Sequence, residues 1–197
     1  MSAPFRLGLT GSIGMGKSTT AALFAAHGLP VWNADFAVHR LYASGGAAVA
    51  LIGSILPDAV VQGSVSRETI REHMAQDPGL LGRIEALIHP LVASDRAEFI
   101  AQSSADIVIL DIPLLFETGT HRQCDATLLV TAPAALQRQR VLSRPGMTES
   151  HFLTLLARQM PDAEKRSRAT HIVETLDRPS TESYVAALIR HIRDHHA

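Results

Sequence analysis

Apolar residues gather in short runs that predict buried strands. Residues 5–10 ("FRLGLT") form one such run, directly before a glycine-rich segment. Residues 106–111 ("DIVILD") and 126–131 ("ATLLVT") have apolar centres, as expected for parallel strands covered on both faces. Residues 31–33 and 170–173 predict two further, weaker strands.

Helical patterns fill the intervals between these strands. They are found at residues 17–27, 133–142, 148–160 and 180–193. Because strands alternate with helices, the sequence predicts a three-layer α/β fold with a mostly parallel five-stranded sheet.

One interval is too long for a simple crossover between strands. Residues 36–105 contain no convincing strand, only helical patterns at 36–42, 47–56, 67–74 and 78–102. We expect a helical insertion here that covers or binds something, although structural padding is the alternative.

Composition limits the classes of protein that fit. With 197 residues, 46% of them hydrophobic, the chain can form one domain (1–197) with an insertion. The single cysteine, Cys124, allows no intramolecular disulfide and indicates a reducing cytoplasm. We see no signal peptide and no apolar run that would span a membrane. A net charge of −1 argues against a general nucleic-acid binder.

The glycine-rich segment carries the strongest chemical signal. It has the pattern Gly11-x-x-x-x-Gly16-Lys17-Ser18, between a predicted strand and a predicted helix. This is the phosphate-binding loop pattern, in which backbone N–H groups surround the β-phosphate. Lys17 is expected to contact the β- and γ-phosphates, and the Ser18 hydroxyl is expected to bind Mg²⁺.

The surrounding sequence favours a kinase among nucleotide-binding proteins. Neither Lys17 nor the other lysine, Lys165, lies in the N-K-x-D pattern that reads guanine, and no L-S-G-G-Q-like signature is present. Asp111 is followed by Ile112, whereas motor ATPases usually have an acidic pair there. The additional Gly14 is common in small-molecule kinases.

Two carboxylates follow predicted strands and are candidates for the chemistry. Asp35 lies just past residues 31–33 and is a candidate general base or acceptor-orienting group. The alternative, which does not exclude this role, is that it is the N-cap of the helix that begins at Phe36. Asp111 ends a buried strand and either holds Mg²⁺ through water or caps the next segment. The carboxyl ends of neighbouring parallel strands share one crevice, so Asp35 can face the glycine-rich loop.

Basic residues concentrate between 138 and 168, which holds seven of the eighteen Lys and Arg residues. We expect an arginine-bearing lid there, and a solvated helical face is the alternative. Arg140 and Arg144 are four residues apart, which predicts that they project from one helix face. Arg144 over the γ-phosphate would stabilise charge in the transition state.

Several segments together resemble the dephospho-coenzyme A kinase family over nearly the whole chain. They are "LTGSIGMGKST", "NAD" at the position of a D-A-D-like motif, "GSVSRETIR", "LIHPLV", "DIPLLFE" and "LQRQRVLSRPGMTESHFLTLLARQ". The resemblance implies ATP-dependent phosphorylation of the ribose 3′-hydroxyl of dephospho-CoA, giving CoA and ADP. It also implies a P-loop kinase fold with a helical CoA-binding insertion (36–105) and a lid (138–168).

The resemblance assigns roles to particular positions. It implies that Gly11 and the loop Gly14-Met15-Gly16-Lys17-Ser18-Thr19 bind ATP. It also implies that Asp35 is the base. Arg140 and Arg144 match lid arginines. Arg67, His89 and the 113–117 segment, with Leu115 and Glu117, match parts of the acceptor site.

The sequence departs from the family pattern at two places. Asn33 stands at the first Asp of the D-A-D-like motif. In "ATHIVETLD", Thr170, Thr175 and Leu176 stand where the family has Asp, Asn and Gly, in a stretch that shapes the adenine end of the site.

Two other functions remain open at this level. One is a kinase for a different small acceptor, such as a nucleotide or a shikimate-like acid. The other is a nucleotide-dependent binding module without phosphoryl transfer. We expect small-molecule partners only, with no nucleic acid and no membrane, and a monomer is compatible with the sequence.

Overall fold

The computed structural model describes residues 3–196, and the chain divides into two compact units. Unit 1 comprises the chain up to Trp32 and from Ser103 onward, and unit 2 comprises Asn33–Gln102. Unit 2 therefore spans nearly the same residues as the helical insertion expected at 36–105. No described helix is both long and apolar enough to cross a membrane.

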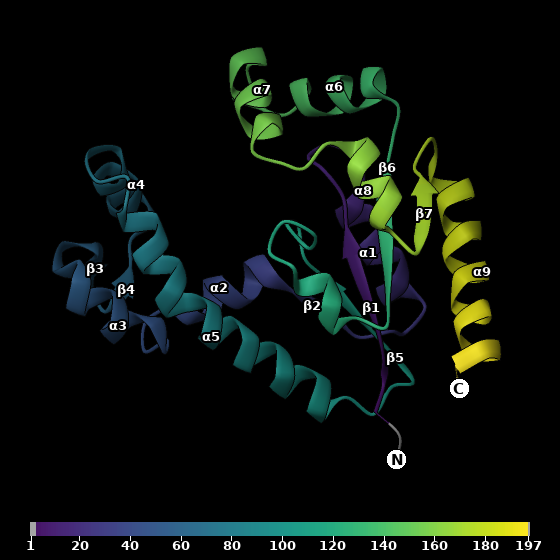
Figure 1. Ribbon diagram of the computed structural model, residues 1–197, viewed down its shortest axis with the longest axis horizontal. Coiled ribbons are helices and arrows are strands. Elements are labelled where there is room, and N and C mark those ends of the chain that lie inside the picture. Colours follow the sequence, from purple (N-terminus) through teal and green to yellow (C-terminus); the bar gives the residue numbers. More distant parts are fainter. Residues whose placement is uncertain (1–2, 197) are drawn as a thin grey trace. The chain divides into compact units, whose positions relative to one another are not determined.

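Unit 1 is built on a five-stranded sheet in the order β2-β5-β1-β6-β7 (Figure 1). β1 pairs in parallel with both β5 and β6, and β6 pairs in parallel with β7. The strands are β1 (Phe5–Thr10), β2 (Val31–Asn33), β5 (Ile107–Asp111), β6 (Ala126–Thr131) and β7 (His171–Glu174). All five predicted strands are confirmed, with the start of β5 and both ends of β7 displaced by one residue.

Helices surround this sheet and enclose an apolar core. They are α1 (Lys17–Ala26), α6 (Ala134–Leu142), α7 (Glu149–Ala157), α8 (Asp162–Arg168), α9 (Arg178–His196) and the 3₁₀ helix η2 (Thr120–Gln123). Leu7 and Leu9 of β1 pack in one cluster with Phe24 of α1 and Ile189 of α9. Because side chains alternate along a strand, Gly8 between them faces the other side of the sheet.

Unit 2 has a separate apolar core made by its own helices. They are α2 (Ala34–Tyr42), α3 (Ala48–Ile55), η1 (Pro57–Ala59), α4 (Arg67–Gln76) and α5 (Leu80–Gln102). Ile52 of α3 packs in this core with Ile84 and Ile88 of α5. The four helical patterns predicted between residues 36 and 105 are therefore confirmed as helices.

A hairpin and a helix differ from the sequence expectation. The expectation of no strand in residues 36–105 is wrong, because β3 (Val60–Val61) and β4 (Ser64–Val65) form a short antiparallel hairpin. Its turn residues Gln62 and Gly63 both have positive φ, which suits a two-residue hairpin. Helix α8 was not predicted, because its "DAEKRSR" sequence is charged around its circumference and has no apolar stripe.

Gly8 in the central strand makes room for the segment that follows β5. A Cβ at Gly8 would lie 2.7 Å from Cys124 Sγ and 2.9 Å from Leu115 Cδ2. Both distances are below van der Waals contact, so this face of β1 packs directly against those two side chains.

We expect Gly8→Ala to lower the free energy of unfolding by about 1–3 kcal/mol through overpacking. Urea unfolding of Gly8→Ala, Cys124→Ala and the double variant measures the coupling between the two positions. The double variant should recover part of the stability lost in Gly8→Ala, because Cys124 Sγ, the atom nearest to the added Cβ, is gone. Gly82→Ala is the matched control, since nothing lies within 4 Å of its added Cβ. Strictly additive losses would contradict this packing.

Candidate active site

The glycine loop, residues 11–17, leads from β1 to α1 and has a backbone that only glycine accommodates. Gly14 has a φ of 77° and Gly16 a φ of 91°. A Cβ at Gly14 would lie 2.5 Å from Val141 Cγ2, and one at Gly16 would lie 2.8 Å from Thr175 Oγ1. Bare backbone N–H groups ahead of a helix N-terminus form an anion site, so the loop is built to hold phosphate.

Side chains from later in the sequence hold this loop in place. Gln137 Nε2 donates to the Ile13 carbonyl at 2.8 Å, and the Ile13 N–H donates to Gln159 Oε1 at 3.1 Å. Thr175 Oγ1 donates to the Met15 carbonyl at 2.7 Å. Sequence reasoning missed both glutamines, because these contacts join residues 124 and 146 positions apart.

Lys17, the first residue of α1, forms an ion pair with Asp111 at the end of β5. Asp111 is only 2% exposed, so this is a buried charge pair beside the loop. Ser18 and Thr19 follow in the first turn of α1 and are exposed. Among the described residues, no three His, Cys, Asp or Glu side chains gather as ligands of a metal ion.

Arg140 connects α6 to the segment after β7. Its guanidinium donates to Thr175 Oγ1 at 2.9 Å and to the Thr175 carbonyl at 2.6 Å. The Thr175 N–H in turn donates to the carbonyl of Thr131, the last residue of β6. Thr175, which stands at an Asn position of the family pattern, is therefore a junction between the loop, the sheet and α6.

The expectation that Arg144 shares a helix face with Arg140 is wrong. Helix α6 ends at Leu142 with Ser143 as its C-cap, so Arg144 lies beyond the helix. Pro145 follows Arg144, and the residue before a proline disfavours helical backbone. Arg144 is exposed, and the structure brings it to no other predicted site residue that is described here.

The basic run between residues 138 and 168 divides into exposed ion pairs and buried contacts. Arg138 pairs with Glu149 at 2.5 Å, and Arg168 pairs with Glu164, both with exposed side chains. For these two arginines, the alternative of a solvated helical face is correct. It does not describe Lys165, which is fully buried.

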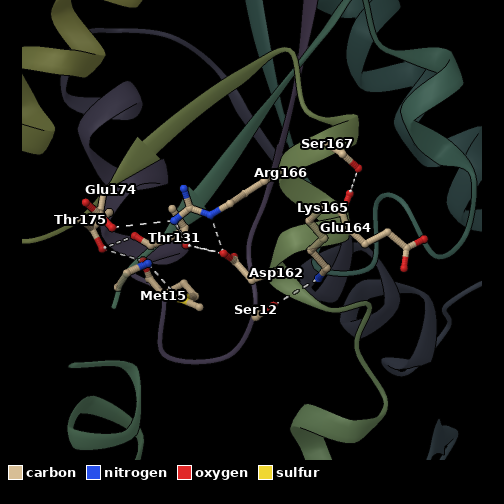
Figure 2. Close-up of polar contacts among 11 residues, drawn as sticks. Ser12, Met15, Thr131, Asp162, Glu164, Lys165, Arg166, Ser167, Glu174 and Thr175 are labelled. Carbon is tan, nitrogen blue, oxygen red and sulfur yellow. Dashed lines mark hydrogen bonds and ion pairs between the residues drawn. The ribbon is translucent and has the colours of Figure 1, made fainter. Parts of the chain in front are cut away.

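Figure 2 shows the polar contacts between α8 and the end of β6. Thr131 Oγ1 lies 3.0 Å and 3.1 Å from the two carboxylate oxygens of Asp162. Arg166 Nε donates to Asp162 Oδ2 at 2.7 Å, and its NH2 group lies 3.1 Å from Thr131 Oγ1. This network fixes α8 against the carboxyl edge of the sheet.

The segment after β5 contains two predicted acceptor residues with different surroundings. Leu115 is fully buried beside Gly8, so its packing does not support direct contact with an acceptor. Glu117 Oε1 accepts from the Met160 N–H at 2.9 Å and pairs with Lys165 Nζ at 3.0 Å. Burial acts to raise the pKa of Glu117, but the Met160 N–H and Lys165 outweigh it, so the pKa lies below its ordinary value.

The remaining predicted site residues lie on three helices of unit 2, and all are exposed. Asp35 is in the first turn of α2, where Asn33 is the N-cap and accepts from the Phe36 N–H at 2.9 Å. The alternative that Asp35 caps this helix is therefore wrong. Arg67, at the start of α4, lies 5.6 Å from the ring centre of Tyr42, and His89 is on α5.

The fold and the loop together define a P-loop kinase. The glycine loop joins the central strand of a parallel α/β sheet to a helix, and its lysine pairs with the carboxylate that ends the neighbouring strand. A family model described as dephospho-CoA kinase matches residues 5–178. The chain belongs to the dephospho-CoA kinase family.

Individual relatives agree with this family. A dephospho-CoA kinase from Cereibacter sphaeroides is 62% identical over 97% of each chain. A solved structure from Thermus thermophilus is 34% identical, with a TM-score of 0.86 over 100% of both chains. The dephospho-CoA kinase structure from Campylobacter jejuni, 18% identical with a TM-score of 0.73 over 98% of both chains, shares the fold.

We expect Thr175→Val to weaken ATP binding, because it removes the hydroxyl that donates to the Met15 carbonyl and accepts from Arg140. The loss of one buried hydrogen-bonding group should also lower the free energy of unfolding by about 1–3 kcal/mol. Calorimetric titration with Mg-ATP and urea unfolding measure the two effects. Thr154→Val, at an exposed hydroxyl on α7, is the matched control, and equal behaviour of the two variants would refute the role of Thr175.

Proposed function

We propose that this chain transfers the γ-phosphoryl group of ATP to the ribose 3′-hydroxyl of dephospho-CoA, giving CoA and ADP. The observation that carries the proposal is the glycine loop, with Lys17 beside Asp111, in a chain of this family. The lone Cys124 suits a cytoplasmic enzyme.

The donor side of the reaction rests on residues of unit 1. The loop N–H groups from Gly11 to Ser18 bind the phosphates, and Lys17 leaves Asp111 to contact the β- and γ-oxygens. The Ser18 hydroxyl and the Asp111 carboxylate, the latter through water, offer the hard oxygen atoms that suit Mg²⁺ arriving with ATP. Held by these residues, Mg²⁺ would neutralise charge on the phosphates.

The acceptor side rests on unit 2 and on Glu117. Asp35 takes the proton of the 3′-hydroxyl as that oxygen forms a bond to the γ-phosphorus. The bond from the γ-phosphorus to the β–γ bridging oxygen breaks, and ADP leaves. Arg67 and His89 bind acceptor groups, which makes unit 2 the acceptor-binding insertion.

The lid, residues 138–168, supplies positive charge to the transferred group. Arg144 is exposed in the turn after α6 and can approach the γ-phosphate when the lid closes. Arg140 contributes from a more fixed position, because its guanidinium is held by Thr175.

The identity of the acceptor is tested directly by mass spectrometry. We expect the purified chain with Mg-ATP to add one phosphoryl group to dephospho-CoA, and none to AMP or shikimate in parallel reactions. Phosphorylation of AMP or shikimate instead would establish a different acceptor. Bound ATP with no product from any acceptor would support a binding module.

We expect Asp35→Asn to lower kcat by at least about 100-fold, the usual scale for general acid–base catalysis, because the amide cannot accept the proton. Affinity for Mg-ATP should stay unchanged, since the glycine loop is intact. Steady-state kinetics and calorimetric titration separate the two effects. Asp58→Asn is the matched control, as Asp58 is also an exposed carboxylate in the first turn of a unit 2 helix. Near-normal turnover of Asp35→Asn would remove Asp35 from the base role.

A further inference from the structure

Lys165 is a buried cation next to the glycine loop that the proposed mechanism does not use. It lies in the middle of α8, and its side chain has an exposed fraction of 0%. Removing an ammonium ion from water costs several kcal/mol even after relaxation of the protein, and an ion pair often fails to recover it. Stability alone is therefore a weak reason to bury Lys165.

The contacts of Lys165 join two parts of the site. Its Nζ lies 3.0 Å from Glu117 Oε1 and 3.4 Å from Ser12 Oγ, the second contact being drawn in Figure 2. Ser12 is the second residue of the glycine loop and is buried. Glu117 belongs to the segment after β5 and also accepts from the N–H of Met160, just beyond α7.

Glu117 depends on this cation. Its Oε2 atom is buried and has no hydrogen-bond partner among the described residues. The Met160 N–H and the Lys165 ammonium group both contact the carboxylate through Oε1. Without the ammonium ion, this carboxylate, whose side chain is 18% exposed, would keep only backbone N–H donors, and its position would be less firmly fixed.

The use of lysine in this chain is selective. Of the eighteen Lys and Arg residues, only Lys17 and Lys165 are lysines. Their side chains are 14% and 0% exposed, whereas those of Arg6, Arg40, Arg83, Arg138, Arg166, Arg168 and Arg193, which pair with carboxylates, are 39% exposed or more. Arg96, at 8%, is a buried arginine outside this group. Both lysines pair with carboxylates of the β5 strand or of the segment that follows it. A compact ammonium ion fits such a site, whereas a planar guanidinium needs more room.

We propose that Lys165 is a positioning residue for phosphoryl transfer, whose buried ammonium ion fixes the glycine loop, through Ser12, against Glu117 and the end of α7. This inference rests on the proposed function. Because α8 is the last part of the lid (residues 138–168), the same contact gives the lid a fixed base on unit 1. Lys165 touches neither substrate directly and acts through Ser12 and Glu117.

The test compares Lys165→Met, Glu117→Gln and the double variant with the wild type. We expect each of the three variants to lower kcat by about 100-fold, which is the usual effect of a small misplacement of reacting groups. The double variant should lose no more than either single variant, because Lys165 and Glu117 act as a unit. The KM for ATP should change by less than about threefold, since the loop N–H groups remain. Thermal unfolding should show a loss of stability in each single variant and its recovery in the double, where no charge is left buried alone.

Arg193→Met, on α9 with the exposed partner Asp106, is the control outside the lid and should match the wild type in both readouts. A purely structural role predicts that kcat recovers with stability in the double variant, which would overturn the proposal. Losses of kcat that add up in the double variant would also overturn it, because they exclude a single unit.

Amide hydrogen exchange tests the positioning without an acceptor. In Lys165→Met we expect faster exchange in peptides that cover residues 9–16 and 113–118, with no change in α9. Unchanged exchange in both segments would refute the proposal. Absence of product from the wild-type chain refutes the proposed function alone, because the exchange comparison does not depend on the acceptor.

Discussion

The parallel register of the central strands is the constraint on which the site depends. Leu9 of β1 is paired with Asp111 of β5, Thr10 of β1 with Leu129 of β6, and Thr131 of β6 with Glu174 of β7. The carboxyl ends of the four strands therefore lie along one edge, where the chain turns into the glycine loop. A shift of one residue in the β1–β5 pairing would turn the side chains of the shifted strand to the opposite face and separate Lys17 from Asp111.

Charge at this edge is held in buried pairs whose partners belong to different elements. Lys17 pairs with Asp111, and Lys165 pairs with Glu117. In the proposed reaction Lys17 exchanges Asp111 for an arriving phosphate, so its ammonium group keeps an anionic partner, while the Lys165–Glu117 pair stays in place. The loop between the pairs is fixed by hydrogen bonds that Gln137 and Thr175 donate and Gln159 accepts, so the anion site is preorganised.

Unit 2 contributes to the proposed reaction through exposed side chains on helices that pack around their own apolar core. Arg40 of α2 pairs with Asp95 of α5 at 2.7 Å, and Ile52 and Ile84 pack inside the unit. Asp35 follows β2 directly, so the chain itself links the proposed base to an edge strand of the unit 1 sheet. A separately packed unit of this kind can bind the acceptor without disturbing the loop that holds the donor.

The sequence by itself determined the five strands of the sheet and the glycine loop. Apolar runs and glycine placement are local signals, so the five strands and the Gly11–Ser18 pattern could be recognised without any contact information. Tertiary structure alone decided which polar residues meet there. Helix α8 has no apolar stripe, so nothing local distinguished buried Lys165 from exposed Arg168, and Leu115 could not be told from a surface residue. Arg140 with Thr175 and Lys165 with Glu117 are contacts between distant segments, and only the packing of those segments on the sheet brings them together.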